Sequence, residues 1–535
     1  MAQPSAARVP QVTPAEERKV ILASSLGTVF EWYDFYLYGT LAVFFGSLFF
    51  PSGNETAAFL ASLATFGAGF AVRPFGALIF GRIGDLLGRK YTFLITIVLM
   101  GVATAGVGLL PTYEQIGVLA PILLVLLRLV QGLALGGEYG GAATYVAEHA
   151  PGNRRGYATS WIQTTATFGF FLSLIVILLC RQGFGEEAFS IWGWRIPFLI
   201  SVVLLGISVY IRLKLQESPA FLRMKSEGKG AKNPLRESFG NPRNLRLVLL
   251  SLFGATAGQA VVWYTGQFYA LFFLQTTLKV DFTIAYVLIA IALALGTPFF
   301  VFFGWLSDRI GRKYIILAGC LVAALTYLPL FHQLARAANP ALAEANATNE
   351  VLVAANDCTV RVFATKAPTT SCDQVKDYLT KRGISYVSER TEGGVATTTV
   401  GSTELQGFDS TQFDEVFRAA GYPATADPDQ INYVMVVLIL FVLVLYVTMV
   451  YGPIAAYLVE LFPTRIRYTS MSLPYHLGNG WFGGFLPFLA AAIVVATGNI
   501  YAGLYYPIAI AVMTLVIGAF LLPETKGRIT DDFTD

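Results

Sequence analysis

Gly81-Arg-Ile-Gly-Asp-Leu-Leu-Gly-Arg-Lys90 is a polar stretch between two long apolar runs, and the chain repeats it as Gly304-Trp-Leu-Ser-Asp-Arg-Ile-Gly-Arg-Lys313. The two copies share the first glycine, the aspartate and the final Gly-Arg-Lys in the same register. Each copy is predicted to form a tight turn between two antiparallel helices, because glycine permits the turn and aspartate stabilises a helix amino end. A repeated turn predicts a repeated half-molecule.

The composition of the chain indicates a membrane protein. Of its 535 residues, 55% are hydrophobic and only 13% are charged, and the mean hydropathy of +0.59 is too high for soluble domains. A helix needs about 20 apolar residues to cross the hydrocarbon core of a bilayer. We therefore predict an all-α membrane protein with twelve transmembrane helices, at 20–48, 57–80, 91–110, 116–147, 157–180, 194–213, 246–275, 283–303, 314–333, 431–459, 468–497 and 501–522.

Basic residues predict the orientation of the chain. Only Arg181, Arg195 and Lys279 fall on short outer loops, whereas most of the other basic residues fall on inner connections and tails, so we expect both termini in the cytoplasm and no signal peptide. The net charge of +3 forms no basic stripe, which argues against nucleic-acid binding. The expected parts are a tail (1–19), a six-helix bundle (20–213), a flexible linker (214–245), a second bundle (246–522) and a tail (523–535).

A polar insert is predicted between the ninth and tenth spans. The hinge aspartates of the two halves lie 223 residues apart, but Glu148 and Glu460 lie 312 apart, so roughly 90 residues were added between them. The insert, at 334–430, is placed on the outer side, where an oxidising compartment favours a disulfide between Cys358 and Cys372. It is either a small disulfide-stapled domain or a partly disordered loop. Within it we expect strands at 386–388 and 397–400 and a helix at 373–382.

Charged residues in the first two spans point to a cavity. Glu31 and Asp34 share one helical face, and carboxylates at this depth are costly unless they line water or meet a cation. The alternative is that they anchor the helix near a membrane interface. Arg73 is placed about 12 Å from the inner end of the second helix. It is expected either to be a counter-ion of these acids or to bind a substrate carboxylate.

The fourth span carries Arg128, Gln131 and Glu138 on one stripe, next to a stripe of glycines. This pattern is typical of a helix that lines a cavity, although a helix pair joined by buried polar contacts gives the same pattern. We assign Arg128 and Gln131 to substrate binding, together with Arg73. We assign Glu138 to proton coupling, together with Glu31 and Asp34.

The second half places polar and aromatic residues at mid-span. The glutamines and rings of the seventh span belong either to an interfacial belt or to the wall of a ligand cavity, and mid-span glutamines favour the cavity. His476 is a candidate proton relay, although a buried neutral histidine is the commoner case. The further residues assigned to substrate binding are Gln163 of the fifth span and Gln259, Trp263, Tyr264, Gln267, Tyr475 and Asn479 of the second half.

Acidic residues at the inner helix ends match between the halves. Glu148 precedes a basic inner loop after the fourth span, and Glu460 does so after the tenth. The positive-inside bias alone explains the basic residues of the decapeptides, but it does not explain why their aspartate and glycines are repeated. We predict an inner gate formed by Asp85, Arg89, Glu148, Asp308, Arg312 and Glu460.

These residues resemble the major facilitator superfamily. The decapeptides are similar to its signature loop between helices two and three and to the copy between helices eight and nine. Four further stretches resemble its metabolite:proton symporter family, whereas the insert departs from that pattern; the stretches are Glu31-Trp-Tyr-Asp-Phe35, Arg73-Pro-Phe-Gly76, Gly136-Gly-Glu-Tyr-Gly140 and Trp192-Gly-Trp-Arg-Ile-Pro-Phe198. The resemblance implies two pseudo-symmetric six-helix bundles around a central cavity that opens alternately to either side.

By the same resemblance, Arg73 faces the cavity, Asp34 and Glu138 are protonation or counter-ion sites, and Asp85 with Arg89 stabilises the inner gate. We expect proton-coupled uptake of a small organic acid, such as a dicarboxylate or keto acid, across a bacterial inner membrane. The alternatives are uptake of a zwitterionic osmolyte such as proline or betaine, and a transporter-derived membrane receptor.

The sequence holds no metal-ligand spacing, nucleophile elbow or phosphate-binding loop, so we do not expect an enzyme. The expected driving force is the proton gradient, with no cofactor and no metal. The expected partners are the substrate, protons and the lipid bilayer, and the protein is expected to function as a monomer.

Overall fold

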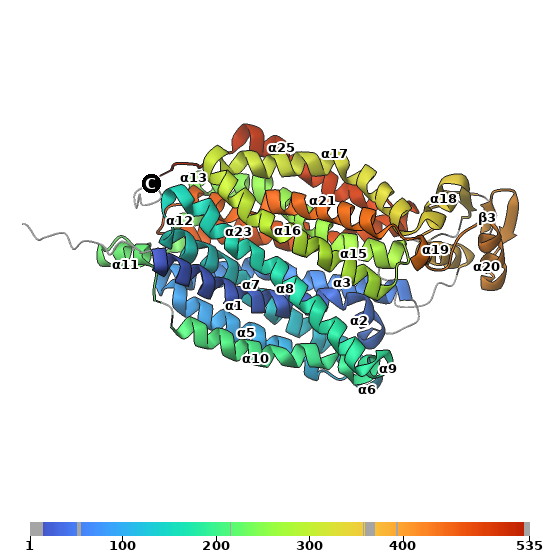
Figure 1. Ribbon diagram of the computed structural model, residues 1–535, viewed down its shortest axis with the longest axis horizontal. Coiled ribbons are helices and arrows are strands. Elements are labelled where there is room, and N and C mark those ends of the chain that lie inside the picture. Colours follow the sequence, from blue (N-terminus) through green and yellow to red (C-terminus); the bar gives the residue numbers. More distant parts are fainter. Residues whose placement is uncertain are drawn as a thin grey trace, which may run out of the picture.

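The computed structural model describes residues 14–50, 55–214, 216–356, 358, 370–391 and 394–528. Long helices run side by side along the longest axis of the molecule (Figure 1). We call one end of these helices the hinge end, because the chain turns there at Gly88 and Gly311, the glycines of the two decapeptides. We call the opposite end, where the inserted segment lies, the insert end.

The first half of the chain forms six long helical runs. Short elements join them at both ends: α6 (Tyr113–Ile116), η1 (Gly152–Arg154), α9 (Glu186–Ala188) and η2 (Phe189–Gly193). The runs are α1 (Pro14–Thr40) with α2 (Ala42–Phe49), α3 (Glu55–Ala71) with α4 (Arg73–Leu86), α5 (Arg89–Leu109), α7 (Leu119–His149), α8 (Arg155–Phe184) and α10 (Arg195–Leu213).

The second half forms six more runs, two of which contain wide π-helical turns. The seventh run is α13 (Pro242–Ser251), η3 (Leu252–Thr256), α14 (Ala257–Tyr264), η4 (Thr265–Tyr269), α15 (Ala270–Phe272) and η5 (Phe273–Thr277). The others are α16 (Phe282–Ile310), α17 (Arg312–Ala338), α21 (Tyr433–Tyr451) with α22 (Ile454–Leu461), α23 (Arg467–Leu477) with η7 (Gly478–Gly483) and α24 (Leu486–Thr497), and η8 (Ala502–Leu504) with α25 (Tyr505–Leu521).

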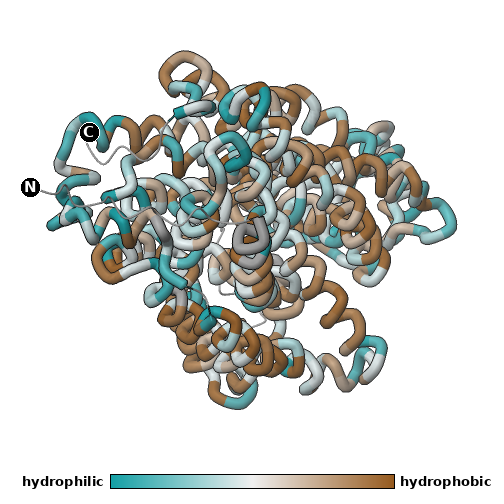
Figure 2. The backbone as a smooth tube through the Cα atoms, turned by 60° about the vertical axis from the view of Figure 1, so that its left-hand side comes forward, coloured by the Kyte–Doolittle hydropathy of each residue, from teal (hydrophilic) through white to brown (hydrophobic). Residues whose placement is uncertain are grey.

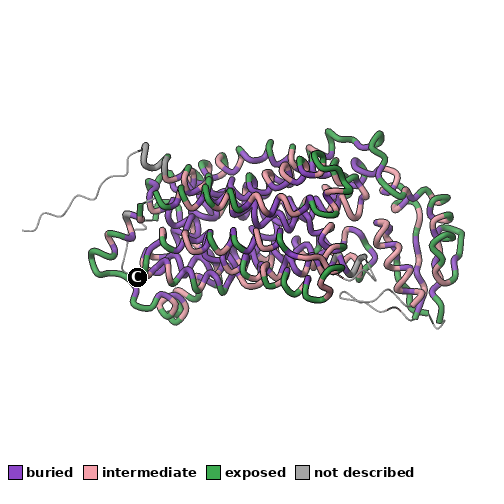
Figure 3. The backbone as a smooth tube through the Cα atoms, turned by 90° about the horizontal axis from the view of Figure 1, so that it is seen from below, coloured by how far each residue is buried: buried purple, intermediate pink, exposed green. Residues whose placement is uncertain are grey.

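The helices have the length and polarity of membrane spans. Within the described residues, eleven runs are long and apolar enough to cross a bilayer. The remaining long run is α1 with α2, which carries Glu31 and Asp34. Hydrophobic residues follow the helices and hydrophilic residues gather at their ends (Figure 2), while buried residues run through the interior of the helical part (Figure 3). The two halves meet where α8 packs on α16 and where α4 packs on α23.

Several helices extend beyond the predicted apolar runs at the hinge end. The predicted eighth span ends at 303, whereas α16 continues to Ile310. A hydropathy pattern marks only the part of a helix that lies inside the hydrocarbon core. The backbone hydrogen bonds of the helix continue beyond the end of that apolar part. Most of each decapeptide is therefore helical, and the turn is confined to Gly88 (φ 124°) and Gly311 (φ 116°), conformations that favour glycine.

Close helix contact explains the glycine stripe of the fourth span. A Cβ atom on Gly132 would lie 1.6 Å from the carbonyl oxygen of Gly69 on α3, and one on Gly136 would lie 2.2 Å from that of Arg73. Only glycine permits this approach of two backbones. The approach holds α7 directly against the bend between α3 and α4, which brings Arg128 and Arg73 near each other.

The insert is a small folded unit. Four strands form a sheet in the order β2-β1-β3-β4, with β1 parallel to β2 and antiparallel to β3. A disulfide joins Cys358 to Cys372, and Phe413 and Phe417 are among its buried residues. The elements are α18 (Pro340–Thr348), β1 (Val351–Ala354), α19 (Ser371–Lys381), β2 (Val387–Glu389), β3 (Thr397–Val400), β4 (Thr403–Gln406), α20 (Ser410–Ala419) and η6 (Pro428–Gln430).

The linker between the halves contains two short helices, α11 (Pro219–Ser226) and α12 (Pro234–Phe239). Ser218 and Asn233 cap them, and a proline occupies the first turn of each. Ser238 of α12 hydrogen-bonds Ser470 of the second half at 2.8 Å. The composition predicts a flexible linker here, and the structure shows two capped helices of which α12 packs against the hinge end.

Candidate functional site

Arg73 lies where the second run bends. α3 ends at Ala71 and α4 begins at Arg73, with Pro74 in its first turn. Proline has no amide hydrogen to continue the preceding helix, so the helix is interrupted before it. The bend leaves the Arg73 side chain inside the protein, with 1% of its surface exposed.

The guanidinium of Arg73 is surrounded by aromatic rings. Its central carbon lies 3.8 Å from the ring centre of Phe70 and 4.4 Å from that of Phe35. Its Nε and Nη2 atoms have no hydrogen-bond partner, and no carboxylate in the described part of the chain lies within ion-pair distance. The expectation that Arg73 is a counter-ion of Glu31 or Asp34 is therefore wrong for this conformation. A ligand carboxylate is the remaining expected partner.

Arg128 lies beside it and is also fully buried. Its Nη1 donates to Oε1 of Gln131 at 2.7 Å, and Nε2 of Gln131 donates to Thr104 at 2.9 Å. The Nε and Nη2 atoms of Arg128 have no partner. Gln131 therefore orients Arg128 in this conformation, and the two arginines form a central arginine cluster, Arg73 and Arg128, with four unsatisfied donor atoms.

Rings from the second half close over the central arginine cluster. Trp263 packs against Trp32 and Tyr36 of α1, with ring centres 6.3 and 5.7 Å apart. Tyr264 packs edge-on against Phe70 at 5.3 Å. The indole nitrogen of Trp263 and the hydroxyl of Tyr36 have no hydrogen-bond partner. The predicted residues Trp263 and Tyr264 thus lie at the interface between the two halves, next to Arg73.

A second set of rings joins α7 to α23. Tyr475 stacks on Tyr139 with ring centres 3.6 Å apart and shares a hydrogen bond with Tyr451 at 2.7 Å. Nε2 of Gln163 donates to the hydroxyl of Tyr139 at 2.6 Å, and its Oε1 has no partner. Tyr139, which the sequence analysis did not select, links the predicted residues Gln163 and Tyr475.

The remaining predicted residues of the second half divide into two groups. Gln259 and Asn479 exchange two amide hydrogen bonds, at 3.1 and 3.0 Å, so each satisfies the other as in a helix pair joined by polar contacts. Both amide atoms of Gln267 and both ring nitrogens of His476 are buried without a partner. These residues lie on or next to the π-helical turns η4 and η7, a feature often found at functional sites. A relay role for His476 stays a prediction.

Two predicted carboxylates converge on an arginine that the sequence analysis missed. Nη2 of Arg212 lies 2.8 Å from Oε1 of Glu31, and Arg212 also pairs with both carboxylate oxygens of Glu138. Thr96 donates to Glu138 at 2.8 Å, whereas Oε2 of Glu31 has no hydrogen-bond partner. We call Glu31, Glu138 and Arg212 the Arg212 triad; α1, α7 and α10 supply one member each.

Arg212 was overlooked because it lies at the inner end of an apolar run, where a basic residue satisfies the positive-inside rule. The burial of two acids nearby is the signal that would have revealed it, since buried carboxylates require a cation. Asp34 lies one helical turn from Glu31, is 5% exposed and has no partner at Oδ1. Asp34 therefore stands apart from the triad.

The predicted gate residues of the first half join the two halves at the hinge end. Oδ1 of Asp85 lies 2.9 Å from Nη1 of Arg89, and Oδ2 accepts hydrogen bonds from both the amide and the hydroxyl of Thr469. Glu148 lies 3.1 Å from Arg467 of α23 and 3.7 Å from Arg89. The first-half carboxylates thus hold the amino end of α23.

The second half repeats this arrangement with the roles exchanged. The carboxylate of Asp308 accepts hydrogen bonds from the backbone amides of Gly156 and Tyr157, both at 2.8 Å, at the start of α8. Arg312 lies 2.9 Å from Asp308 and 3.1 Å from Glu460, which also lies 3.5 Å from Arg155. All six predicted gate residues therefore take part in contacts that close the hinge end.

A third pair of acids supports each hinge from its own half. Glu217 accepts from the backbone amides of Arg89 and Lys90, at 3.1 and 3.2 Å, and Glu524 accepts from those of Arg312 and Lys313 at 2.9 Å. Carboxylates favour the positive end of a helix. Glu217 therefore stabilises the amino end of α5, and Glu524 stabilises the amino end of α17 in the same way.

The fold and these residues can be compared with known proteins. The family described as "Sugar (and other) transporter" matches residues 19–246 and 416–534, which is more than half of the chain. The chain belongs to this family of major facilitator superfamily transporters. Its relatives are transporters and not enzymes. The match leaves out residues 247–415, which hold most of the seventh to ninth helical runs and most of the insert.

Several curated relatives are named as transporters. A proline/betaine transporter of Salmonella typhimurium is 38% identical over 322 residues, which cover 59% of this chain and 64% of that protein. The inner membrane metabolite transport protein YhjE of Escherichia coli is 37% identical, with 62% and 76% covered. Alpha-ketoglutarate permease of Escherichia coli is 35% identical, with 64% and 78% covered. These names confirm the resemblance to the metabolite:proton symporter family.

A solved structure shares the fold. The major facilitator superfamily proton:xylose symporter XylE, bound to 6-bromo-6-deoxy-D-glucose, superposes with a TM-score of 0.64 at 16% identity, covering 97% of this chain and 98% of that one. At this identity the match concerns the fold. It confirms the prediction of twelve helices in two bundles. Within the described residues, no group of three or more His, Cys, Asp or Glu side chains could hold a metal ion.

Proposed function

We propose that the protein imports a small organic acid together with protons, by opening alternately at its two ends. The observation that carries this proposal is the central arginine cluster, whose four donor atoms are buried without partners. Leaving a buried donor of a charged group unsatisfied is costly, and a ligand carboxylate would satisfy two at once through the planar guanidinium fork. Two arginines match the two carboxylates of a dicarboxylate.

The Arg212 triad supplies a site for the coupled proton. Two carboxylates share one guanidinium, so the ionised triad carries one negative charge in excess, and Oε2 of Glu31 is free to accept a proton. Protonation of Glu31 would remove that excess and weaken its pair with Arg212. Moving one charge across 100 mV supplies about 2.3 kcal/mol, so a proton taken up outside and released inside can drive accumulation. The cycle requires no cofactor.

We assign the structure to one state of the proposed cycle. Contacts between the halves close the hinge end. The positive-inside rule favours the cytoplasmic side of the membrane for this end and for both termini. The conformation would then be the one in which substrate approaches from outside. Import proceeds when the hinge contacts break and the arginine cluster opens to the cytoplasm.

Uptake of a zwitterionic osmolyte is the second candidate function, and the aromatic rings favour it. Trp32, Tyr36 and Trp263 pack together beside Arg73, with ring centres 5.0 to 6.3 Å apart. Such rings attract quaternary ammonium groups, and arginine binds a carboxylate. Relatives named as proline/betaine transporters agree with it. The two candidates differ in the net charge of the ligand.

Uptake by purified protein in proteoliposomes tests both candidates. Alpha-ketoglutarate, shikimate, proline and glycine betaine would be offered with and without an inward proton gradient. We expect gradient-dependent accumulation of an acid, and Arg73→Gln should reduce it at least tenfold, because the fork that binds carboxylate is lost. Exposed Arg82 supplies the control variant, Arg82→Gln.

Accumulation of glycine betaine or proline instead would favour the second candidate. Ligand binding without accumulation would identify a receptor. Wild-type uptake by Arg73→Gln would contradict the assigned binding site.

A further inference from the structure

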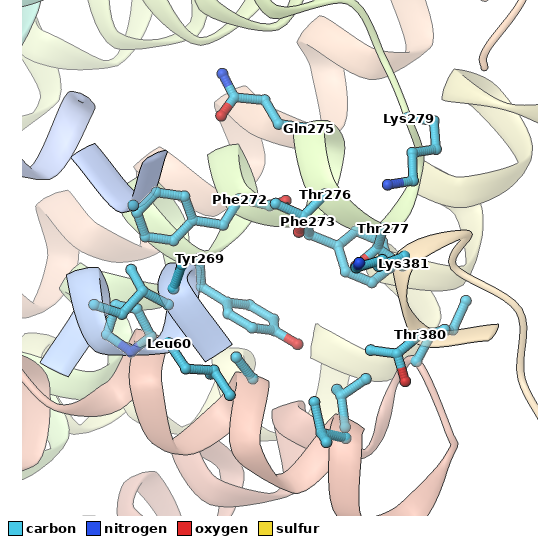
Figure 4. Close-up of a pocket in the computed structure, with 18 of the residues that line it drawn as sticks. Leu60, Tyr269, Phe272, Phe273, Gln275, Thr276, Thr277, Lys279, Thr380 and Lys381 are labelled. Carbon is cyan, nitrogen blue, oxygen red and sulfur yellow. Dashed lines mark hydrogen bonds between the residues drawn. The ribbon is translucent and has the colours of Figure 1, made fainter. Parts of the chain in front are cut away.

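A pocket at the insert end is built from three parts of the chain. Its volume is about 490 Å³, and Figure 4 shows its side chains. The first half contributes α2 and α3, the second half contributes the end of the seventh run and α24, and the insert contributes α19. Because both halves form its walls, its shape depends on their relative position.

The walls of the pocket are apolar, and its polar rim carries two lysines. Leu60, Phe272 and Phe273 are among the apolar lining residues, and no carboxylate is among the described lining residues. Lys279, from the loop before α16, and Lys381, from the end of α19, both line the pocket (Figure 4). Lys381 also pairs with Asp377 of the same helix at 3.0 Å.

The insert fixes both lysines in place. Within the described residues, Lys279 is the one non-glycine residue with positive φ, at 57°, and its carbonyl oxygen accepts a hydrogen bond from the amide of Ala426. An unusual backbone conformation of this kind persists only where surrounding structure holds it, and it is found at ligand sites. After Lys381 the chain turns at Gly383, where a Cβ atom would lie 2.0 Å from the carbonyl oxygen of Thr277. The insert is therefore seated directly on the end of the seventh run.

The pocket leads toward the central arginine cluster. Leu63 of α3 lines the pocket, and Phe66 and Phe70 follow it on the same helix face. Phe66 packs against Phe268 of the seventh run at 5.4 Å. The guanidinium of Arg128 lies 5.4 Å from the ring of Phe66. One layer of aromatic rings, which includes Phe66, Phe70 and Phe268, thus separates the pocket from the buried arginines.

We propose that this pocket is an outer binding site for the transported organic anion, in which Lys279 and the insert residue Lys381 hold the carboxylate before the aromatic layer opens. The proposal rests on the proposed function. In this site the carboxylate of the anion contacts the two lysines, and its carbon skeleton packs against the apolar wall. The inserted segment then belongs to the substrate path, and its position on the second half keeps both lysines at the pocket.

Kinetics of uptake test the site, with alpha-ketoglutarate or shikimate as the probe, whichever the wild-type protein accumulates. Lys279→Gln and Lys381→Gln should each raise KM about threefold to tenfold at unchanged kcat, as expected when one charge that attracts the ligand is removed. The double variant should raise KM further, and added salt should reduce the difference from wild type. Lys376→Gln is the matched control, because Lys376 lies on the same helix outside the pocket and faces Tyr386.

Labelling gives a second readout that does not depend on transport. A cysteine at Thr380, which lines the pocket, should react with a membrane-impermeant maleimide added from outside, and the probe acid should slow that reaction. The two native cysteines outside the disulfide are buried. Unchanged KM in the double lysine variant, together with labelling that the probe does not slow, would overturn the outer site.

Two further outcomes separate the causes of failure. If the lysine effect occurs only in vesicles that contain phosphatidylglycerol and disappears in phosphatidylcholine vesicles, an anionic lipid headgroup occupies the lysines and the proposal is wrong. If the wild-type protein accumulates no acid under a proton gradient, the proposed function fails and the outer site fails with it. Wild-type accumulation, with unchanged KM in the double lysine variant and labelling that the probe does not slow, refutes the outer site alone.

Discussion

At the scale of single residues, Glu31 is the group in which proton coupling is tested most directly. One of its carboxylate oxygens pairs with Arg212 and the other has no partner. Glu31→Gln keeps the size of the side chain and an oxygen for Arg212 but cannot release a proton. We predict that this variant loses at least tenfold in gradient-driven accumulation while it still exchanges labelled for unlabelled substrate. Uptake and exchange measured on the same proteoliposomes check it.

The control for this variant is Glu114→Gln, which changes an exposed glutamate of the same half. It should accumulate substrate at the wild-type level. Gradient-driven accumulation by Glu31→Gln at that level would remove the Arg212 triad from the coupling mechanism.

The sequence revealed these candidate residues better than it revealed their partners. Glu31 and Glu138 were recognisable because acids inside an apolar helix are costly, but their spacing does not reveal that they share Arg212. Gln259 and Asn479 looked like ligand-binding residues because each is polar at mid-span. Their mutual hydrogen bonds depend on how α14 packs on η7, and no local pattern encodes that packing.

At the scale of elements, the hinge contacts stabilise the closed end. Asp85 accepts two hydrogen bonds from Thr469, and hydrogen bonds to a charged group contribute about 1.5–3 kcal/mol each. Asp85→Ala should therefore shift the population toward opening of the hinge end. A cysteine at buried Ser472, which faces Gly140 across the interface, reports that opening. We predict that Asp85→Ala raises its maleimide labelling rate at least tenfold, the change that about 1.4 kcal/mol produces, which is less than one such hydrogen bond contributes.

Asp308→Ala should have a similar effect, because Asp308 holds the start of α8 as Asp85 holds the start of α23. Asp429→Ala, at an exposed site of the insert, is the control and should leave labelling unchanged. An unchanged rate in Asp85→Ala would show that these contacts do not control opening.

The sequence predicted some elements of the insert and failed to predict others. The helix near 373–382 and the strand at 397–400 were predicted, and α19 and β3 occupy nearly these positions. α20 was missed, although Phe413 and Phe417 are four residues apart and mark one buried helical face. β1 has only four residues, and its pairing with both β2 and β3 joins segments distant in the sequence.

At the scale of the whole molecule, the insert is fixed to the second half. Tyr386 donates its amide to Gly498, Ala426 donates to Lys279, and Ile500 donates to Ser385. Asn339 and the hydroxyl of Tyr386 also donate to the second half, to the carbonyl oxygens of Leu278 and Val495. If the halves rotate against each other, the insert should therefore move with the second half.

Distances between spin labels test this prediction. Labels would be placed at the exposed positions Thr411 of the insert, Val434 of the second half and Val118 of the first half. When Asp85→Ala or bound substrate shifts the conformation, the Thr411–Val434 distance should stay constant, while the Thr411–Val118 distance should change by about 5 Å or more, as expected for rigid-body rotation of two bundles. Gly383→Ala should broaden both distances, because its methyl group displaces the insert from Thr277. A constant Thr411–Val118 distance with a variable Thr411–Val434 distance would assign the insert to the first half and would separate Lys381 from Lys279 during the cycle.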